Sequence, residues 1–517
     1  MNVAKYFSTQ RFCRSLGATL LLIAIACAST SAQTRTNRSL SKQDDAFLED
    51  LSRRSFRFFW EKADPKTGLV SDRARANGKP YDSDHRSRNI ASSAATGFGL
   101  TALCIAAERG WVGRQAARDR VLTTLRFYAE RAPHEHGFFY HFVDKETGER
   151  RWNSEISTID TTLLLGGVLT ARQYFHQDRE IVRLATLIYE RVDFPWMLVG
   201  DSLLISMGWR PETGFIKHTW NHYSEHTMLQ LLAIGSPTHP IKPGAWMAWQ
   251  RLRLTYGGYT YLTFLRAPLF IHQYSQAWVD YRDQEESWYP YTNYFENSVK
   301  ATLAHRQFCM DLSDKFPGYS ENVWGITASD SAKGYRAWGG PPATPDIDGT
   351  VVPCAAAGSL MFTPEITLAA LKTMFERWGD RIYDHYGFVD AFNPNNGWVN
   401  RDVIGIDLGI TILSAENLRT GNVWRWFMRN REVPRAMQLA GFRKVRRSPR
   451  TQKMGGRREA GMRRSGAVSQ SPRLPSPPSL PSHNLKARFT QVFRIRTNHD
   501  LEFTRFDYKP HFAIVKT

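Results

Sequence analysis

Cysteine is scarce in this sequence, with five residues in a chain of 517. Two of them lie in the first 32 residues, and the other three, Cys104, Cys309 and Cys354, are widely separated. An odd, scattered set can close at most one bridge and is not a disulfide framework. The fold must therefore be stabilised by a hydrophobic core, for which 42% hydrophobic and 13% aromatic residues provide the material.

Several nucleotide-binding and nucleophile motifs are also absent. The sequence contains no Walker A loop, no Gly-x-Gly-x-x-Gly dinucleotide motif and no Gly-x-Ser-x-Gly nucleophile turn. P-loop phosphoryl transfer, dinucleotide-dependent redox chemistry and serine hydrolysis therefore have no support from motifs. We expect no cofactor.

The positive charge of the chain is concentrated at its two ends. The formal net charge is +19, but residues 446–517 contain 16 Lys and Arg against 4 Asp and Glu, and residues 1–39 contain 5 against none. Residues 40–445 hold 47 basic against 45 acidic residues and are nearly neutral. The charge therefore does not indicate a nucleic-acid partner for the central part of the chain.

The N-terminal end predicts export. Residues 1–32 combine a basic start, an apolar stretch at 16–28 that is too short to span a membrane, and small residues at 30–32 for cleavage. This pattern is typical of a signal peptide and predicts a periplasmic or secreted protein. Cleavage before Cys27 with attachment of lipid is the alternative, and we expect no other contact with a membrane.

The rest of the chain divides into three parts. We expect a linker at residues 33–41, one catalytic domain at 42–445 and a basic tail at 446–517. The tail is rich in Arg, Ser and Pro, and this low-complexity composition predicts that it is disordered or an artefact of the sequence.

Apolar-periodic stretches alternate with short aromatic turns through the domain. Residues 121–128 and 181–188 have apolar positions three and four apart, as in amphipathic helices, whereas 97–107 and 158–174 are small or apolar on nearly all sides. Inner helices covered by amphipathic outer helices explain this alternation. We therefore predict an all-α fold, an (α/α)6 toroid or barrel with short β-hairpins in the connecting loops, and a monomer.

Carboxylates in apolar or aromatic surroundings are candidate catalytic groups. Asp160 lies in the first turn of an apolar helix, Glu225 at the start of a helix predicted over residues 223–234, and Asp407 between two glycines. A helix-capping or solvated role for Asp160 or Asp407 is the alternative. Two acids at a cleft suffice for glycoside cleavage, because one can protonate the leaving oxygen while the other activates water or attacks the sugar.

The string His222-x-x-Glu225-His226 also matches an inverted zinc-peptidase signature. Two His residues four apart on one helix can bind zinc while the Glu acts as base. The match is short and arises often by chance, so we expect no metal and keep a zinc hydrolase as a minor alternative. Full activity in EDTA would eliminate it.

Eight motifs occur in order along the chain. They are residues 157–160 (STID), 235–241 (GSPTHPI), 269–280 (LFIHQYSQAWVD), 324–330 (WGITASD), 338–342 (WGGPP), 348–353 (DGTVVP), 386–393 (YGFVDAFN) and 405–407 (GID). Together they resemble the glycoamylase-like domain family, which contains the bacterial endo-β-1,2-glucanases. The resemblance covers about residues 42–443 and implies an (α/α)6 barrel, a periplasmic or extracellular site, and hydrolysis of β-1,2-glucan with inversion.

The resemblance also implies roles for individual residues. Glu225 is implied as the proton donor and Asp407 as the base, with Glu155 and Asp160 lining the sugar subsites. Other residues expected at the substrate are His272, Tyr274, Trp324, Asp330, Trp338 and Asp390. One departure is Leu408, where we expect Gln after the GID motif, and this leaves the mechanism or substrate open.

Two further readings stay open. The chain can be a non-catalytic glycan-binding protein on the same scaffold, or a related hydrolase of another or a cyclic β-glucan. Other glucan linkages, and both endo and exo action, stay open as alternatives at this point.

Overall fold

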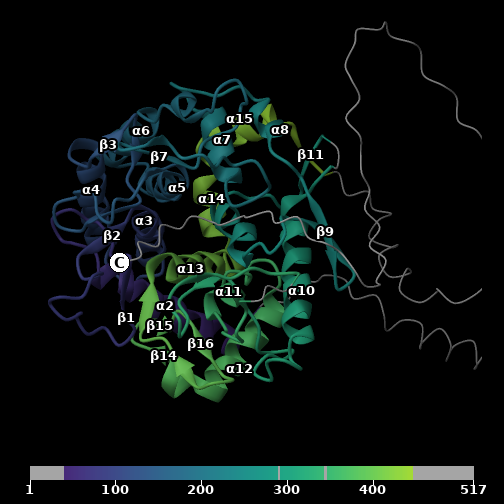
Figure 1. Ribbon diagram of the computed structural model, residues 1–517. Helices are drawn as coiled ribbons and strands as arrows, with labels where there is room; N and C mark the ends of the chain where they lie inside the picture. Colours follow the sequence, from purple (N-terminus) through teal and green to yellow (C-terminus); the bar gives the residue numbers. More distant parts are fainter. Residues whose placement is uncertain (1–39, 289–290, 343–345, 446–517) are drawn as a thin grey trace, which may run out of the picture. The chain divides into compact units, whose positions relative to one another are not determined.

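The computed structural model describes residues 40–288, 291–342 and 346–445. The predicted signal peptide and the predicted C-terminal tail lie outside these residues. Helices dominate the described part, and short strands connect many of them (Figure 1).

The helices match the all-α prediction in type and order. They are α2 (Lys42–Glu61), α3 (Ser93–Glu108), α4 (Arg114–Glu130), α5 (Thr158–Tyr174), α6 (Arg179–Glu190), α7 (Thr227–Gly235), α8 (Ala245–Ala248), α9 (Tyr274–Trp278), α10 (Tyr294–Asp311), α11 (Pro353–Ala357), α12 (Pro364–Ile382), α13 (Gly405–Arg419), α14 (Asn422–Phe427) and α15 (Glu432–Leu439), with 3₁₀ turns η1 (Phe194–Met197) and η2 (Leu269–His272).

Four helices, α3, α5, α7 and α13, are buried on nearly all sides. Their small residues explain how they approach one another. An added Cβ on Gly167 of α5 would meet the backbone oxygen of Gly97 of α3 at 2.0 Å, so the two helix backbones are in contact there. Bulkier residues at these positions would separate the helices. The apolar composition of these segments is therefore a consequence of their central position.

Amphipathic helices cover the buried ones. In α4 the predicted face of Val121, Leu125 and Tyr128 is buried, and in α6 Ile181 and Ile188 lie on the buried face. Helix α6 packs on both α4 and α5, α13 packs on α2 and α3, and α15 packs on α7. Figure 1 shows α4, α6 and α12 nearer the periphery than α3, α5 and α13. The predicted two layers of helices are confirmed.

The strands are short and form small antiparallel sheets. The pairs are β1 (Arg73–Arg75) with β18 (Asp402–Ile404), β2 (Ile90–Ser92) with β5 (Phe142–Asp144), β3 (His134–Glu135) with β4 (Phe138–Phe139), β9 (Arg253–Tyr256) with β10 (Tyr259–Leu262), β11 (Gln284–Glu286) with β19 (Phe442–Lys444), β12 (Ala328–Ser329) with β13 (Arg336–Ala337), β14 (Tyr383–Asp384) with β15 (Gly387–Phe388) and β16 (Phe392–Asn393) with β17 (Trp398–Val399); β6 (Ile156–Ser157), β7 (Gly208–Arg210) and β8 (Gly214–Phe215) form a three-stranded sheet.

The helix predicted over residues 223–234 begins later than expected. His222 forms a parallel β-bridge with Gln250, and the Tyr223 N–H donates to the Gln250 carbonyl at 2.9 Å. These bonds hold the chain extended, so α7 starts only at Thr227. His222 and His226 therefore do not lie on one helix.

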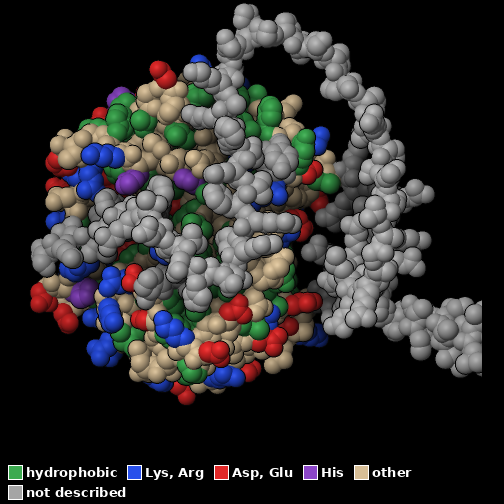
Figure 2. Space-filling model, turned by 45° about the vertical axis from the view of Figure 1, so that its right-hand side comes forward, with side chains coloured by type: hydrophobic (Ala, Val, Ile, Leu, Met, Phe, Trp, Pro, Cys, Tyr) green, Lys and Arg blue, Asp and Glu red, His purple; other side chains and the backbone are tan. Residues whose placement is uncertain are grey.

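The surface and the cysteines agree with the composition. Figure 2 shows Lys and Arg side chains interspersed with Asp and Glu on the visible face of the described residues. Cys104, Cys309 and Cys354 are free and buried. Within the described ranges, no helix is long and apolar enough to cross a membrane.

Candidate active site

The candidate acids lie at the N-terminal ends of buried helices. Strand β6 leads directly into α5 and β18 into α13, so Asp160 and Asp407 both fall in a first helical turn. The Ser157 hydroxyl caps α5 by accepting from the Asp160 N–H, and it donates to the Asp160 carboxylate at 2.5 Å. Glu225 lies two residues before the start of α7. The fold thus presents three carboxyl groups at comparable helix ends.

Glu225 is a buried carboxyl group. Its residue is 8% exposed, and the Ser224 hydroxyl donates a hydrogen bond to it. Burial raises the pKa of Glu225 to about 7, and the charge of Asp160 adds to this rise. Near neutral pH a large fraction of Glu225 therefore carries the proton that a general acid needs.

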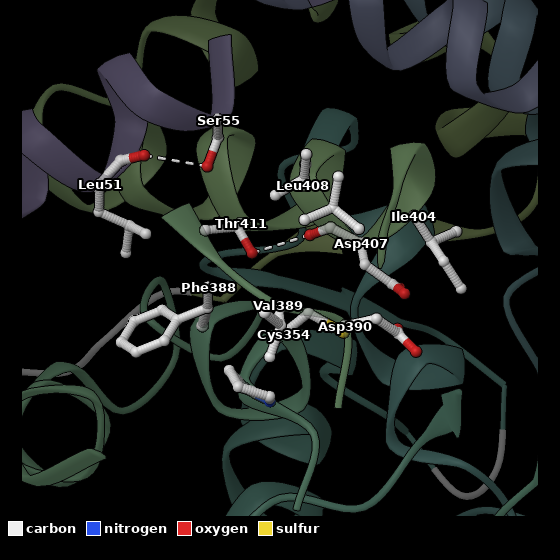
Figure 3. A pocket seen from close by; sticks show the side chains of 13 residues that line it. Leu51, Ser55, Cys354, Phe388, Val389, Asp390, Ile404, Asp407, Leu408 and Thr411 are labelled. Atoms are coloured by element: carbon white, nitrogen blue, oxygen red, sulfur yellow. Dashed lines mark hydrogen bonds between the residues drawn. The ribbon is translucent and has the colours of Figure 1, made fainter. Parts of the chain in front are cut away.

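Asp407 is buried as well, with 5% of the residue exposed. Burial raises its pKa to about 6, although hydrogen bonds with Asp390 and the Cys354 thiol act in the opposite direction. Figure 3 shows the carboxyl groups of Asp407 and Asp390 directed to the same side of a small cavity. The alternative of a solvated capping residue is wrong for Asp407. Above about pH 6 this group is ionised and able to accept a proton.

A shared phenol links the two acids. Tyr274, on α9, is buried, and its pKa is raised first by burial and then by the charges of Asp407 and Glu225, among others. The Ser275 hydroxyl, next to Tyr274, donates to the Glu225 carbonyl, and α9 packs on α13, so α9 lies beside both acid-bearing segments. Asp160 acts electrostatically on Glu225, and Asp72 acts on Asp407. The charges of these acids therefore contribute to one another's pKa values.

His141 is a site residue that the sequence did not reveal. Its ring nitrogens lie 3.2 Å from Glu155 and 3.3 Å from Asp160, and its ring stacks on Phe142 at 3.7 Å. Burial alone would lower the pKa of His141, but the charges of Asp160 and Glu155 outweigh it and raise the pKa to about 9. His141 is therefore an imidazolium at neutral pH. It joins the two acids that the resemblance assigns to sugar subsites.

Glu155 is further fixed by Arg210. The Arg210 guanidinium donates to Glu155 at 3.1 Å. Burial would raise the pKa of Glu155, but the hydrogen bond and charge of His141, with Arg210, lower it to about 2. Asp160 behaves differently, because burial raises its pKa above the ordinary value. The pair therefore contains one fully ionised carboxylate and one that is more readily protonated.

A second cluster of charged and polar side chains surrounds Arg73, near Asp407. The Arg73 guanidinium donates to Asp330 at 2.9 Å and to Asp72 at 3.1 Å. The Asn400 amide donates to Asp330 at 2.9 Å and to Asp390 at 3.2 Å. The structure thus brings the predicted residues Asp330 and Asp390 together with Asp407, and it adds Arg73 and Asn400, which the sequence did not reveal.

Two predicted substrate residues lie in the core instead. His272 is 3% exposed and packs beside Tyr223 with ring centroids 5.2 Å apart, and burial lowers its pKa to about 3. Trp324 has no exposed surface. Neither ring is accessible to a sugar in this structure. Trp338 is 5% exposed, and its contact with substrate stays a prediction.

The donor set required by the zinc alternative is not assembled. His226 is fully buried against Trp220, with ring centroids 5.4 Å apart, and burial lowers its pKa to about 3. His222 instead contacts Asn221 at 2.7 Å. The downstream Glu286 is held by Arg251 and neighbouring donors. Within the described residues, no three His, Cys, Asp or Glu side chains are grouped to hold a metal ion.

A family model matches part of the chain. Residues 217–431 match the glycoamylase family model, described as "Putative glucoamylase". This match confirms the resemblance predicted from the motifs, and the matched range includes both Glu225 and Asp407.

A curated protein is similar over most of this chain. The exo β-1,2-glucooligosaccharide sophorohydrolase (non-reducing end) of Parabacteroides distasonis is 28% identical over 446 residues, which cover 79% of this chain and 60% of that protein. The chain thus spans about 60% of the length of this curated relative.

Solved structures share the fold. An endo-β-1,2-glucanase from Chitinophaga pinensis, in complex with sophorotriose and glucose, superposes with a TM-score of 0.72 at 27% identity, covering 78% of this chain and 99% of that one. An endo-β-1,2-glucanase from Talaromyces funiculosus, in complex with sophorose, gives a TM-score of 0.58 at 13% identity, covering 80% and 93%. The second likeness concerns the fold alone.

Proposed function

We propose that this chain is an exported glycoside hydrolase that cleaves a β-linked glucan, specifically β-1,2-glucan in an endo manner, with inversion. The observation that supports this most is the pair of buried acids Glu225 and Asp407, whose charges both act on Tyr274. The pKa of Glu225 is about 7 and that of Asp407 about 6, so between these values the first is largely protonated and the second largely ionised. Glycoside cleavage by inversion requires one protonated and one ionised carboxyl group of this kind.

In this mechanism Glu225 donates its proton to the glycosidic oxygen as the bond to the anomeric carbon breaks. Asp407 removes a proton from the water that attacks that carbon from the opposite face. Inversion needs room for the water, which in such enzymes corresponds to a carboxyl separation of roughly 6.5–9.5 Å. After this single displacement Glu225 is ionised and Asp407 is protonated, and both exchange protons with solvent before the next turnover. Because water is the nucleophile, no covalent intermediate forms on Asp407.

The choice of β-1,2-glucan rests on the relatives. Both the Parabacteroides distasonis protein and the Chitinophaga pinensis structure are named for β-1,2-linked glucose substrates. We favour endo action because the match extends over 99% of the Chitinophaga chain and over 60% of the exo-acting relative. An exo mode is the second candidate, and the Parabacteroides distasonis relative supports it.

Three finer features belong to this proposal. We propose that α3, α5, α7 and α13 are inner helices of an (α/α)6 toroid, since all four are buried and the solved relatives are superposable. Export is proposed from the predicted signal peptide. Leu408 is 5% exposed and lines the cavity beside Asp407 together with Leu51 and Ser55, so the departure from Gln changes the packing behind the base.

A panel of linear glucans of defined linkage, with product analysis, tests the function. We expect the purified protein to release a series of oligosaccharides from β-1,2-glucan and nothing from β-1,3-, β-1,4- or α-linked glucans. Release of a disaccharide alone from the start would establish the exo mode. Binding of β-1,2-glucan without any release would instead support the non-catalytic glycan-binding alternative.

The roles of the two acids predict two inactive variants. Glu225→Gln and Asp407→Asn should each lower kcat on β-1,2-glucan by about 10²–10⁴-fold, because each removes one proton-transfer group. Glu376→Gln, an exposed change on α12, is the matched control and should leave kcat unchanged. Near-normal kcat in either site variant with an intact fold would reject its role.

A further inference from the structure

Asp390 and Asp407 are two buried acids that line the same small cavity (Figure 3). Each carboxyl group shifts the pKa of the other, although the two come from different elements, since Asp390 follows β15 and Asp407 lies in the first turn of α13. Asp390 is 3% exposed and Asp407 5%. Two buried carboxylates near each other repel strongly when both are ionised, so a proton shared between them is favoured.

The bonding of Asp390 shows which of its oxygens holds this proton. Its Oδ2 accepts from the Asp330 N–H at 2.8 Å and from the Asn400 amide at 3.2 Å. Both donors require a lone pair on Oδ2. Its Oδ1 is buried and has no conventional donor or acceptor partner among the described residues. A proton on Oδ1 satisfies that atom by donating to Asp407.

The surroundings of Asp407 favour its ionised form. It lies in the first turn of α13, where the helix dipole stabilises negative charge, and the Cys354 thiol is a second hydrogen-bond donor to it. Burial raises the pKa of Asp390 well above its ordinary value, followed by the charges of Asp407 and Asp330. Both effects assign the shared proton to Asp390.

Other charged and titratable groups face this pair from several elements. They are Asp72 and Arg73 from β1 and the residue before it, Asp330 after β12, Tyr335 before β13, Tyr274 on α9 and Cys354 on α11. Arg73 is the cation of this group, and its charge is shared among Asp72, Asp330 and Asp390. It therefore does not neutralise both acids of the pair.

We propose that Asp390 is a neutral carboxylic acid that donates its proton in a hydrogen bond to Asp407 and so holds the base in one orientation. In this role Asp390 is a positioning residue, and the earlier expectation of a sugar-binding carboxylate is replaced. The role of Asp407 as base rests on the proposed function. The location of the proton does not depend on it.

Substitution of Asp390 distinguishes the two roles kinetically. Asparagine can place an N–H where the Oδ1 proton lies and keep an acceptor for Asp330 and Asn400. We expect Asp390→Asn to keep kcat within about tenfold of the wild type, because a weaker donor replaces the acid. Asp390→Ala should lower kcat by about 100-fold, because the base is no longer oriented.

The pH profile separates positioning from a merely structural effect. The rising limb of kcat/KM should be retained in Asp390→Asn and move to higher pH in Asp390→Ala, because loss of a donor to the ionised form makes Asp407 harder to ionise. Loss of activity in Asp390→Asn as complete as in Asp407→Asn would overturn the proposal.

Infrared spectroscopy tests the proton itself and does not require activity. Glu225 is the other buried acid of the site that carries a proton in the proposed mechanism. The Glu225→Gln variant lacks that proton, so it serves as the parent protein at pH 8. The difference spectrum between this parent and the Glu225→Gln/Asp390→Asn variant should show loss of a carboxylic-acid C=O band. Loss of a carboxylate band instead would show that Asp390 is ionised and would overturn the proposal. The difference spectrum between Glu225→Gln and Glu225→Gln/Glu376→Gln is the control for an exposed carboxylate. The infrared measurement tests the protonation of Asp390 even if Asp390→Ala does not fold.

Discussion

At the scale of the residue, the surroundings of Glu225 and Asp407 suit them to opposite roles, Glu225 as the acid and Asp407 as the base. Both are buried, and burial raises both pKa values. Glu225 has one hydroxyl donor, from Ser224, whereas Asp407 has hydrogen bonds with Asp390 and Cys354 that favour its ionised form. The pKa of Glu225, about 7, stays above that of Asp407, about 6, which suits the first to the role of acid and the second to that of base.

These pKa values predict a narrow pH optimum. kcat/KM on β-1,2-glucan should rise as Asp407 ionises, around its pKa of about 6, and fall as Glu225 loses its proton, around its pKa of about 7. Initial rates from pH 4 to pH 9 at low substrate measure both limbs. A plateau that extends to pH 9 would contradict the role of Glu225 as acid, because its ionised form cannot donate a proton.

The burial of Glu225 should also destabilise the fold in a pH-dependent way. Its pKa is about 7 in the folded chain against 4.5 for an ordinary Glu. Between these values the folded state holds a proton that the unfolded state releases, so stability falls as pH rises through this window. The free energy of unfolding of Glu225→Gln should therefore exceed that of the wild type by about 3 kcal/mol above pH 7. Below pH 4.5 the two free energies should differ little.

Urea unfolding of the two proteins at several pH values measures this difference. Glu376→Gln, exposed on α12, is the control and should give no such gain. An equal stability of wild type and Glu225→Gln at pH 8 would mean that Glu225 ionises freely in the folded protein.

The acids of the site could be predicted from the sequence, whereas their partners could not. Asp160 stands out in the first turn of an apolar helix, Asp407 between two glycines, and Glu225 at the start of a predicted helix. His141 and Arg73 lie in ordinary hairpin sequences, and their contacts join positions such as Arg73 and Asp330 that are 257 residues apart. Only the folded chain shows that these cations compensate the acids. Trp324 shows the opposite error, because a ring in a motif is not necessarily at the surface.

At the scale of the element, the site depends on helices that begin at comparable places. The extended segments β6 and β18 end where α5 and α13 begin, and each junction delivers an acid into the first turn. The predicted bounds of α5 are confirmed, since its apolar run is uninterrupted. The predicted start of α7 is wrong by four residues. The β-bridge between His222 and Gln250, which delays the helix, is a long-range contact without a local signal in the sequence.

The contact of α3 with α5 predicts a strong effect of one methyl group. Gly167→Ala would place a Cβ 2.0 Å from the Gly97 oxygen and force the helices apart. We expect a loss of about 3 kcal/mol or more in unfolding free energy. Gly379→Ala on α12 is the matched control, because its nearest neighbours would lie 3.5 Å away. It should raise stability by about 0.5–1 kcal/mol.

Urea unfolding compares the two glycine variants directly. If Gly167→Ala were as stable as Gly379→Ala, the two helices would not be in backbone contact, and the central packing described above would be incorrect.

At the scale of the whole molecule, the described contacts continue through β19 to Val445, whose N–H donates to the Asp283 carbonyl at 2.9 Å. Phe442 packs against Trp246 and Tyr281, with ring centroids 5.3 Å and 5.5 Å apart, and β19 pairs with β11. Removal of residues 446–517 leaves these contacts in place. We therefore expect the chain truncated after Val445 to keep the melting temperature and kcat of the full chain.

A shorter truncation is the control for the tail. Ending the chain after Leu439 also removes Phe442 and strand β19, and it should lower the melting temperature because buried aromatic contacts are lost. A loss of folding or of activity on removal of 446–517 alone would show that the tail contributes to the domain.

Proton NMR of the first product released from linear β-1,2-glucan most directly examines whether Glu225 and Asp407 act as an acid and a base on opposite faces of one glucose unit. The account predicts that the new reducing end appears first as the α-anomer and then mutarotates, and that Glu225→Gln and Asp407→Asn release almost none. First appearance of the β-anomer, or turnover without either acid, would contradict it.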